Sequence, residues 1–336
     1  MLDQAKIGSV PGRTFTSAVL IVGICIGALI GNFAPSAGEW LGNGVDYSLW
    51  ALVGLLFFGV RFNALFQALK NIRFLAIALF ANFIVVPLIG YGIASLFLSA
   101  HPLFMVGLVV YFMSPCTDWF LSFTRLSGGN APLGTTLIPI NMTVQLLLYP
   151  FFLQWFTQNT VQLEAAVVYS SLLQWFLLPL VIAILAHQLL RLVLKSERFD
   201  IVLERADQFT PWLTALLVMQ IFAGNISTIL ENSAVFIWLL LAVFLFFLLT
   251  FLLGEGLSRA FRLQYPDHAL LTMTIAARNA PLMLAVTTAA LPDQPLIYSA
   301  LIIGMLVEFP HLTALRRLLL RRSGQMTFSS VNASAR

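Results

Sequence analysis

Two charged residues lie inside stretches that are otherwise apolar. Arg278 interrupts the stretch 269–291, and Glu308 interrupts the stretch 296–315. Charged side chains are costly in hydrocarbon and usually mark the path of an ion or a substrate. A guanidinium can bind an anion, whereas a carboxyl group can carry a proton or bind a cation. These two residues are therefore the first candidates for a functional site.

Polar breaks interrupt two of the apolar stretches. The break at 278–281 contains Arg278 and a proline, and the break at 114–118 contains Cys116 and a proline. Proline cannot continue a regular helix, and a bilayer tolerates the freed backbone groups only beside protein or a water-lined cavity. We therefore expect both breaks to face a site. The other candidates for contacts with a substrate are Thr117, Asn141 and Asn279, and Asp118 is a further candidate for ion coupling.

The composition indicates a polytopic membrane protein. Hydrophobic residues make up 60% of the chain, charged residues only 10%, and the mean hydropathy is +0.92. A water-soluble fold needs more polar surface than this. We predict an all-α protein with about ten membrane-spanning helices, each of about 20 residues. The predicted spans are 15–33, 49–65, 74–98, 103–123, 133–156, 165–190, 212–230, 235–253, 269–291 and 296–315.

Basic residues predict the orientation of these helices. Lys and Arg occur before the first span and after every second span, whereas the intervening loops contain neither. Because the cytoplasmic side of a membrane keeps Lys and Arg, we expect both termini in the cytoplasm and the protein in a bacterial-type inner membrane. This one-sided pattern also explains the net charge of +4, so membrane lipid is an expected partner and nucleic acid is not.

The two breaks also predict an internal repeat. Each is followed by a short proline-containing link and by a span with a polar residue close to a proline, Asn141 or Glu308. We predict two inverted repeats of about five helices, 1–160 and 161–322, in which broken helices four and nine cross. Residues 323–336 are predicted to form a disordered cytoplasmic tail. This architecture is typical of secondary transporters with alternating access.

Three motifs carry a family resemblance. They are Asn82-Phe83-Ile84-Val85-Val86-Pro87, Pro115-Cys116-Thr117 and Leu306-Val307-Glu308-Phe309-Pro310. The chain resembles the bile acid, arsenite and riboflavin transporter superfamily over nearly its whole length, and within it the arsenite efflux permeases of the arsenical-resistance type. The resemblance implies a core domain that holds two broken, crossing helices and a panel domain that moves against it.

The resemblance also implies roles for two residues. In the arsenite permeases a cysteine of the fourth helix and a glutamate of the tenth are the functional pair, and they correspond here to Cys116 and Glu308. A thiol suits trivalent arsenic because both are soft. Low dielectric favours the neutral form of a carboxyl group, so Glu308 could take up and release a proton. The implied function is proton-coupled efflux of arsenite or antimonite, with Cys116 as the arsenic ligand and no cofactor.

Two features depart from the arsenite permeases. Those proteins usually carry an Asn-Asn-Phe-Glu type of sequence where this chain has Arg278, and Asp118 is not one of their characteristic residues. Arg278 could instead bind an organic carboxylate or sulfonate, in a sodium-coupled symporter to which Asn279, Asp118 and Glu308 contribute oxygens. Arg278 could equally pair with Asp118 or Glu308 and never touch the substrate. An enzyme is not expected, because the sequence has neither a paired-acid motif nor a nucleophile with its base.

Overall fold

The computed structural model describes residues 12–59, 71–117, 119–157 and 178–334, and these residues are predominantly helical. The chain divides into two compact units. Unit 1 consists of Met1–Gly59 and Gln174–Glu231, and unit 2 consists of Val60–Leu173 and Asn232–Arg336. Each unit thus combines segments from both of the predicted repeats. Their inverted symmetry stays a prediction.

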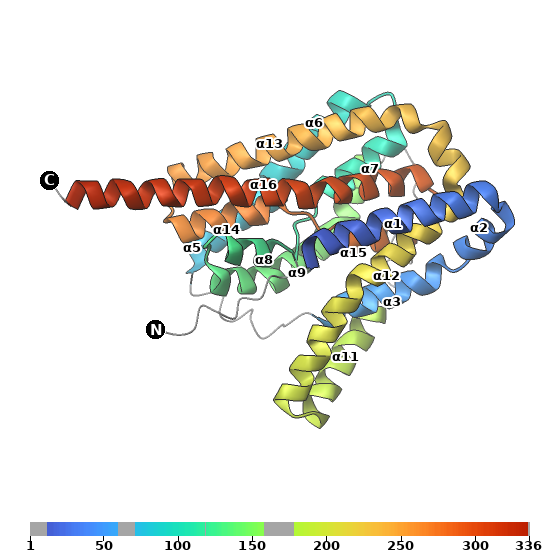
Figure 1. The fold of residues 1–336 in the computed structure, drawn as a ribbon, viewed down its shortest axis with the longest axis horizontal. Coiled ribbons are helices and arrows are strands. Elements are labelled where there is room, and N and C mark those ends of the chain that lie inside the picture. Colours follow the sequence, from blue (N-terminus) through green and yellow to red (C-terminus); the bar gives the residue numbers. More distant parts are fainter. Residues whose placement is uncertain (1–11, 60–70, 118, 158–177, 335–336) are drawn as a thin grey trace. The chain divides into compact units, whose positions relative to one another are not determined.

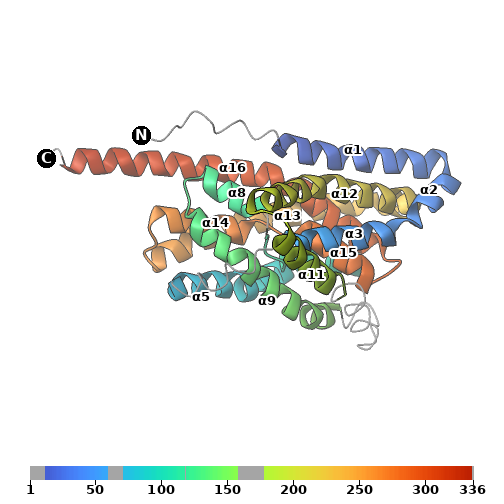
Figure 2. The same ribbon diagram turned by 90° about the horizontal axis from the view of Figure 1, so that it is seen from below.

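Unit 1 is built around the packing of α1 along α12, which Figures 1 and 2 both show. The face of α1 that meets α12 carries glycines, and a Cβ atom on Gly27 would overlap the carbonyl oxygen of Met219. Small residues let membrane helices approach this closely. The helices of unit 1 are α1 (Gly12–Phe33), α2 (Pro35–Gly42), α3 (Val45–Phe58), α11 (Leu178–Val193) and α12 (Ser196–Glu231).

Unit 2 contains both breaks. The first separates α7 (Pro102–Phe112) from α8 (Trp119–Leu126), and the second separates α14 (Tyr265–Ala276) from α15 (Ala280–Ala290). A proline lies in the first turn of α7, α14 and α15, where its missing N–H costs no hydrogen bond. The other elements are α5 (Ile72–Phe80), the π-helix η4 (Ala81–Val85), α6 (Val86–Leu98), α9 (Ala131–Thr157), the 3-10 helix η6 (Ser233–Val235), α13 (Phe236–Ala260) and α16 (Pro295–Ser334).

The last helix organises unit 2. α16 packs against α7, α13, α14 and α15, and Figure 1 shows it running beside α13. It continues to Ser334 and so includes most of the segment for which the sequence predicts a disordered tail. The link between α8 and α9 is fastened to the start of α14, because Asn130 N–H donates to the carbonyl of Pro266 and its side chain donates to Asp267.

The described helices confirm a polytopic membrane protein. Five of them are long and apolar enough to cross a membrane, and the bent pair α2 and α3 would make a sixth. Among the shorter apolar helices are Pro102–Phe112 and Ala280–Ala290, each of which adjoins a break. The larger number of spans, their orientation and the cytoplasmic position of the termini stay predictions. The five long segments are Ile72–Leu98, Ala131–Trp155, Glu197–Glu231, Ser233–Ala260 and Pro295–Arg321.

Candidate functional site

The two breaks pair with one another through their backbones. The Cys116 N–H donates to the carbonyl of Ala277 at 3.0 Å, and the Asn279 N–H donates to the carbonyl of Ser114 at 2.9 Å. The two bonds form an isolated antiparallel bridge between the breaks. Backbone groups freed by one break are therefore satisfied by the other, as buried backbone groups must be. This pairing joins the break after α7 to the break after α14.

A side-chain hydrogen bond reinforces the bridge. Asn279 Nδ2 donates to Thr117 Oγ1 at 3.0 Å, and both side chains are buried. The structure thus brings together Cys116, Thr117 and Asn279, which the sequence predicts as substrate contacts. Asp118, predicted as an ion-coupling residue, lies outside the described residues.

The guanidinium of Arg278 lies on the C-terminal ends of two half-helices. Arg278 is 0% exposed. One terminal nitrogen donates to the carbonyl of Phe112 in α7 at 2.9 Å, and the other donates to Thr274 and Ile275 in α14 at 3.1 and 2.6 Å. The carbonyl end of a helix is negative and lacks intrahelical partners, so a cation stabilises it. A single side chain therefore caps both α7 and α14.

Glu308 is attached to both broken helices. It is 2% exposed and comes from α16. Oε1 accepts from the backbone N–H of Arg278 at 3.0 Å, and Oε2 accepts from the hydroxyl of Tyr111 at 3.3 Å. Gly304, one turn earlier in α16, makes room for Tyr111, because a Cβ atom there would lie 2.7 Å from the ring. The backbone of Arg278, and not its guanidinium, donates to Glu308.

The structure places Cys116 and Glu308 on the same pair of breaks. Cys116 is 0% exposed, and its backbone N–H donates to Ala277, the residue before Arg278, whose own backbone N–H donates to Glu308. The chain's other cysteine, Cys25, is exposed on α1 in unit 1. The two breaks and α16 therefore hold Cys116 and Glu308 in the interior of unit 2.

A second polar cluster adjoins the break after α14. Thr274 Oγ1 accepts from Asn82 Nδ2 at 3.2 Å and from Asn141 Nδ2 at 3.3 Å, and all three residues are buried. Asn82 lies in η4, and π-helical turns often occur at functional sites. Among the described residues, Asn82 Oδ1, Asn141 Oδ1 and both amide atoms of Gln145 have no hydrogen-bond partner. Buried polar atoms usually have a hydrogen-bond partner.

Tyr111 and Asn82 belong to these clusters but are absent from the candidate site residues drawn from the sequence. Tyr111 gives no signal, because tyrosine is common in membrane spans at the interface. Asn82 does give a sequence signal, since it is the single side-chain amide in the apolar stretch 74–98. Only the structure shows that Tyr111 meets Glu308 and that Asn82 meets the residues around Thr274.

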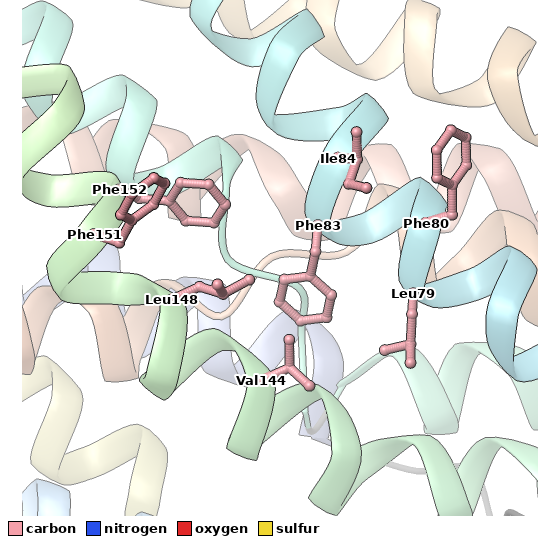
Figure 3. Close-up of a pocket in the computed structure, with 8 residues that line it drawn as sticks. All are labelled: Leu79, Phe80, Phe83, Ile84, Val144, Leu148, Phe151 and Phe152. Carbon is pink, nitrogen blue, oxygen red and sulfur yellow. The ribbon is translucent and has the colours of Figure 1, made fainter.

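Unit 2 also has an apolar groove that offers no polar chemistry. Its volume is about 500 Å³, and it opens between the helix that contains η4 and α9 (Figure 3). All its lining side chains are hydrocarbon, so it offers neither a thiol nor a hydrogen-bonding group to a polar solute. We therefore assign the candidate site to the paired breaks. The lining residues are Leu79, Phe80, Phe83, Ile84, Val144, Leu148, Phe151 and Phe152.

Buried charged and polar side chains at two paired helix breaks, within a membrane-spanning helical unit, are characteristic of a secondary transporter. The chain belongs to the Sodium Bile acid symporter family, whose sequence profile matches residues 49–232. The expectation of a transporter, rather than an enzyme, is thereby confirmed.

The chain is also similar to three curated transport or resistance proteins. A probable chloroplastic sodium/metabolite cotransporter, BASS2 of Oryza sativa subsp. japonica, is 24% identical over 246 residues, which are 71% of this chain and 55% of the relative. The uncharacterized sodium-dependent transporter YocS of Bacillus subtilis is 21% identical over 84% of each chain. The arsenical-resistance protein Acr3 of Corynebacterium glutamicum is 22% identical over 76% of this chain and 72% of its own. The chain thus spans about half the length of the rice relative.

Proposed function

We propose that this transporter exports trivalent arsenic, as arsenite or antimonite, in exchange for protons. The observation that carries the proposal is that Cys116 is fully buried in the paired breaks, where its backbone N–H donates to Ala277, the residue before Arg278. A thiol is the protein ligand best suited to a soft, trivalent arsenic centre. The name of the Corynebacterium relative, an arsenical-resistance protein, points the same way.

The chemistry at Cys116 is a reversible ligand exchange. The thiol sulfur forms a bond to arsenic in As(OH)₃, one As–OH bond breaks, and the thiol proton leaves with that hydroxide as water. No electron is transferred, so the reverse reaction with water releases the solute on the opposite side. Because one thiol makes one bond, the complex is weak enough to dissociate, as a transport cycle requires.

Glu308 is the proposed proton carrier. Its carboxyl group is held by Tyr111 and by the backbone of Arg278, so it is linked to both breaks. Gain and loss of a proton would change the charge of the cluster that contains Cys116. The proposal includes alternating access about the two breaks and an inner-membrane location with cytoplasmic termini. Asn279 and Thr117 complete the proposed solute contacts.

Arsenite resistance in a sensitive bacterial host tests the proposal. Cys116→Ser should abolish resistance and the export of arsenite from cells, because an alcohol does not replace a thiol as an arsenic ligand. Cys25→Ser is the matched control and should keep both, since Cys25 is exposed in the other unit. Full resistance with Cys116→Ser would exclude the thiol mechanism.

A second candidate function is sodium-coupled symport of an organic anion. It is favoured by the unpartnered amide oxygens of Asn82 and Asn141, since oxygen ligands suit hard cations, and by the names of the rice and Bacillus relatives. Sodium-dependent accumulation of a labelled carboxylate, lost in Asn82→Ala, would support it. No sodium dependence in vesicles would exclude it. Both terminal nitrogens of Arg278, which this function needs for the anion, already donate to three carbonyls, and only Nε has no partner among the described residues.

A further inference from the structure

We propose that the guanidinium of Arg278 is a built-in cation that takes the place of a coupling sodium ion, so that transport by this chain is independent of sodium. The inference rests on the proposed transport function and concerns its coupling ion. It departs from the sodium dependence in the names of the family and of two relatives.

The guanidinium of Arg278 binds carbonyls of the kind that coordinate a coupling cation in other transporters. In transporters with broken helices, unwound carbonyls and the C-terminal ends of half-helices are the groups that coordinate a coupling cation. Here the carbonyls of Phe112, Thr274 and Ile275 come from the ends of both half-helices, and all three accept from Arg278. The carbonyl cage that would receive sodium thus contains a covalently attached positive charge.

The positive charge of Arg278 is permanent and fixed in position. Arginine stays protonated in proteins, so the cation is present throughout the cycle. Its central carbon lies 5.7 Å from the ring centroid of Phe246, which is within the range of a cation–π contact. Phe246 is itself stacked on Phe112, with ring centroids 3.9 Å apart. Aromatic side chains and carbonyls therefore hold the guanidinium in place, and solvent does not reach it.

The amide cluster of Asn82 and Asn141 is linked to the guanidinium of Arg278. Thr274 joins it to the guanidinium, because its carbonyl accepts from Arg278 while its hydroxyl accepts from Asn82 and Asn141. The fixed positive charge of Arg278, held on the same threonine, would repel a sodium ion at the unpartnered amide oxygens of Asn82 and Asn141, and like charges repel most strongly where water is excluded.

Thermal unfolding of the purified, full-length protein in detergent tests the inference without reference to a solute. The midpoint is measured in sodium chloride, potassium chloride and choline chloride at equal concentration. The wild type should give the same midpoint in all three salts. Arg278→Ala leaves the carbonyls empty, so its midpoint should be lower in potassium and choline and should rise by several degrees in sodium alone. Millimolar guanidinium should also raise it.

A control variant tests whether a sodium response follows from the loss of any arginine or only from the loss of Arg278. Arg316 also donates to a helix-terminal carbonyl, that of Leu126 in α8, but it lies outside the breaks. Arg316→Ala should therefore show no sodium-specific rise. If Arg278→Ala cannot be purified even in sodium, Arg278→Gln replaces it, with the same expected response.

A sodium-specific rise in the unfolding midpoint of the wild type overturns the inference, and this measurement needs no variant. An Arg278 variant that does not distinguish sodium from potassium also overturns it. Sodium-independent wild-type stability with a sodium-responsive variant supports it. If the wild type binds sodium while resistance still depends on Cys116, only this inference fails. If Cys116→Ser keeps full resistance, the proposed solute fails and the salt measurements still stand.

Discussion

The side-chain amide of Asn279 donates to the hydroxyl of Thr117 across the two helix breaks, at 3.0 Å. The two residues are 162 positions apart in the chain, and both are buried. Beside them, two backbone hydrogen bonds join the same breaks. The two interruptions therefore form one local structure, in which the residues from one broken helix complete the hydrogen bonding of the other.

The first prediction concerns this contact. Asn279→Ala and Thr117→Val each remove one partner and leave the other buried without it, which costs about 1–3 kcal/mol of stability. The double variant should lose less stability than the sum of the two single losses, because both variants remove the same hydrogen bond. Thermal unfolding in detergent measures the three midpoints, and a coupling energy of about 0.5–1.5 kcal/mol is expected. Strictly additive losses would show that the residues do not interact.

The second prediction concerns the proton carrier. Glu308→Gln keeps an oxygen that can accept from the N–H of Arg278, but it cannot exchange a proton. Arsenite movement driven by a pH gradient in everted vesicles should therefore fall to background. Exchange of labelled for unlabelled arsenite should persist, since the thiol remains. Gradient-driven transport at the wild-type rate would remove Glu308 from the coupling mechanism.

The third prediction concerns the amide cluster. Thr274→Val keeps the shape of the side chain but removes the acceptor of Asn82 and Asn141, so two buried amides lose a partner. We expect a loss of about 1–3 kcal/mol in the free energy of unfolding. Thr274→Ser retains the hydroxyl and is the control, with a smaller loss. Equal stabilities for the two variants would argue against these hydrogen bonds.

The fourth prediction concerns the packing of α7 on α16. A Cβ atom on Gly107 would overlap the carbonyl oxygen of Ile297 and would lie 2.9 Å from the Cβ of Ala300. Gly107→Ala should therefore destabilise the protein by about 1–3 kcal/mol, because one of the two helices must shift. Gly92→Ala, where nothing lies within 4 Å of the added atom, should be neutral or slightly stabilising. The two unfolding midpoints provide the comparison.

Much of the architecture follows from the sequence because it depends on local composition. Long apolar runs require a membrane, and the prolines at 115 and 281 mark both interruptions because polar or charged residues accompany them, whereas Pro139, Pro150 and Pro310 lie inside continuous helices. Arg278 and Glu308 are recognisable for a similar reason, because charged side chains are out of place in hydrocarbon. Cys116 is recognisable by its position in a break and by the family resemblance.

The partners of these residues were decided only by the tertiary structure. Arg278 and Glu308 are 30 positions apart, and no local rule reveals that the backbone of Arg278, rather than its guanidinium, meets Glu308. No local rule reveals that the guanidinium caps two half-helices, or that Tyr111 and Asn82 belong to the site. Composition and proline act along the chain, whereas these contacts depend on how helices distant in sequence pack together.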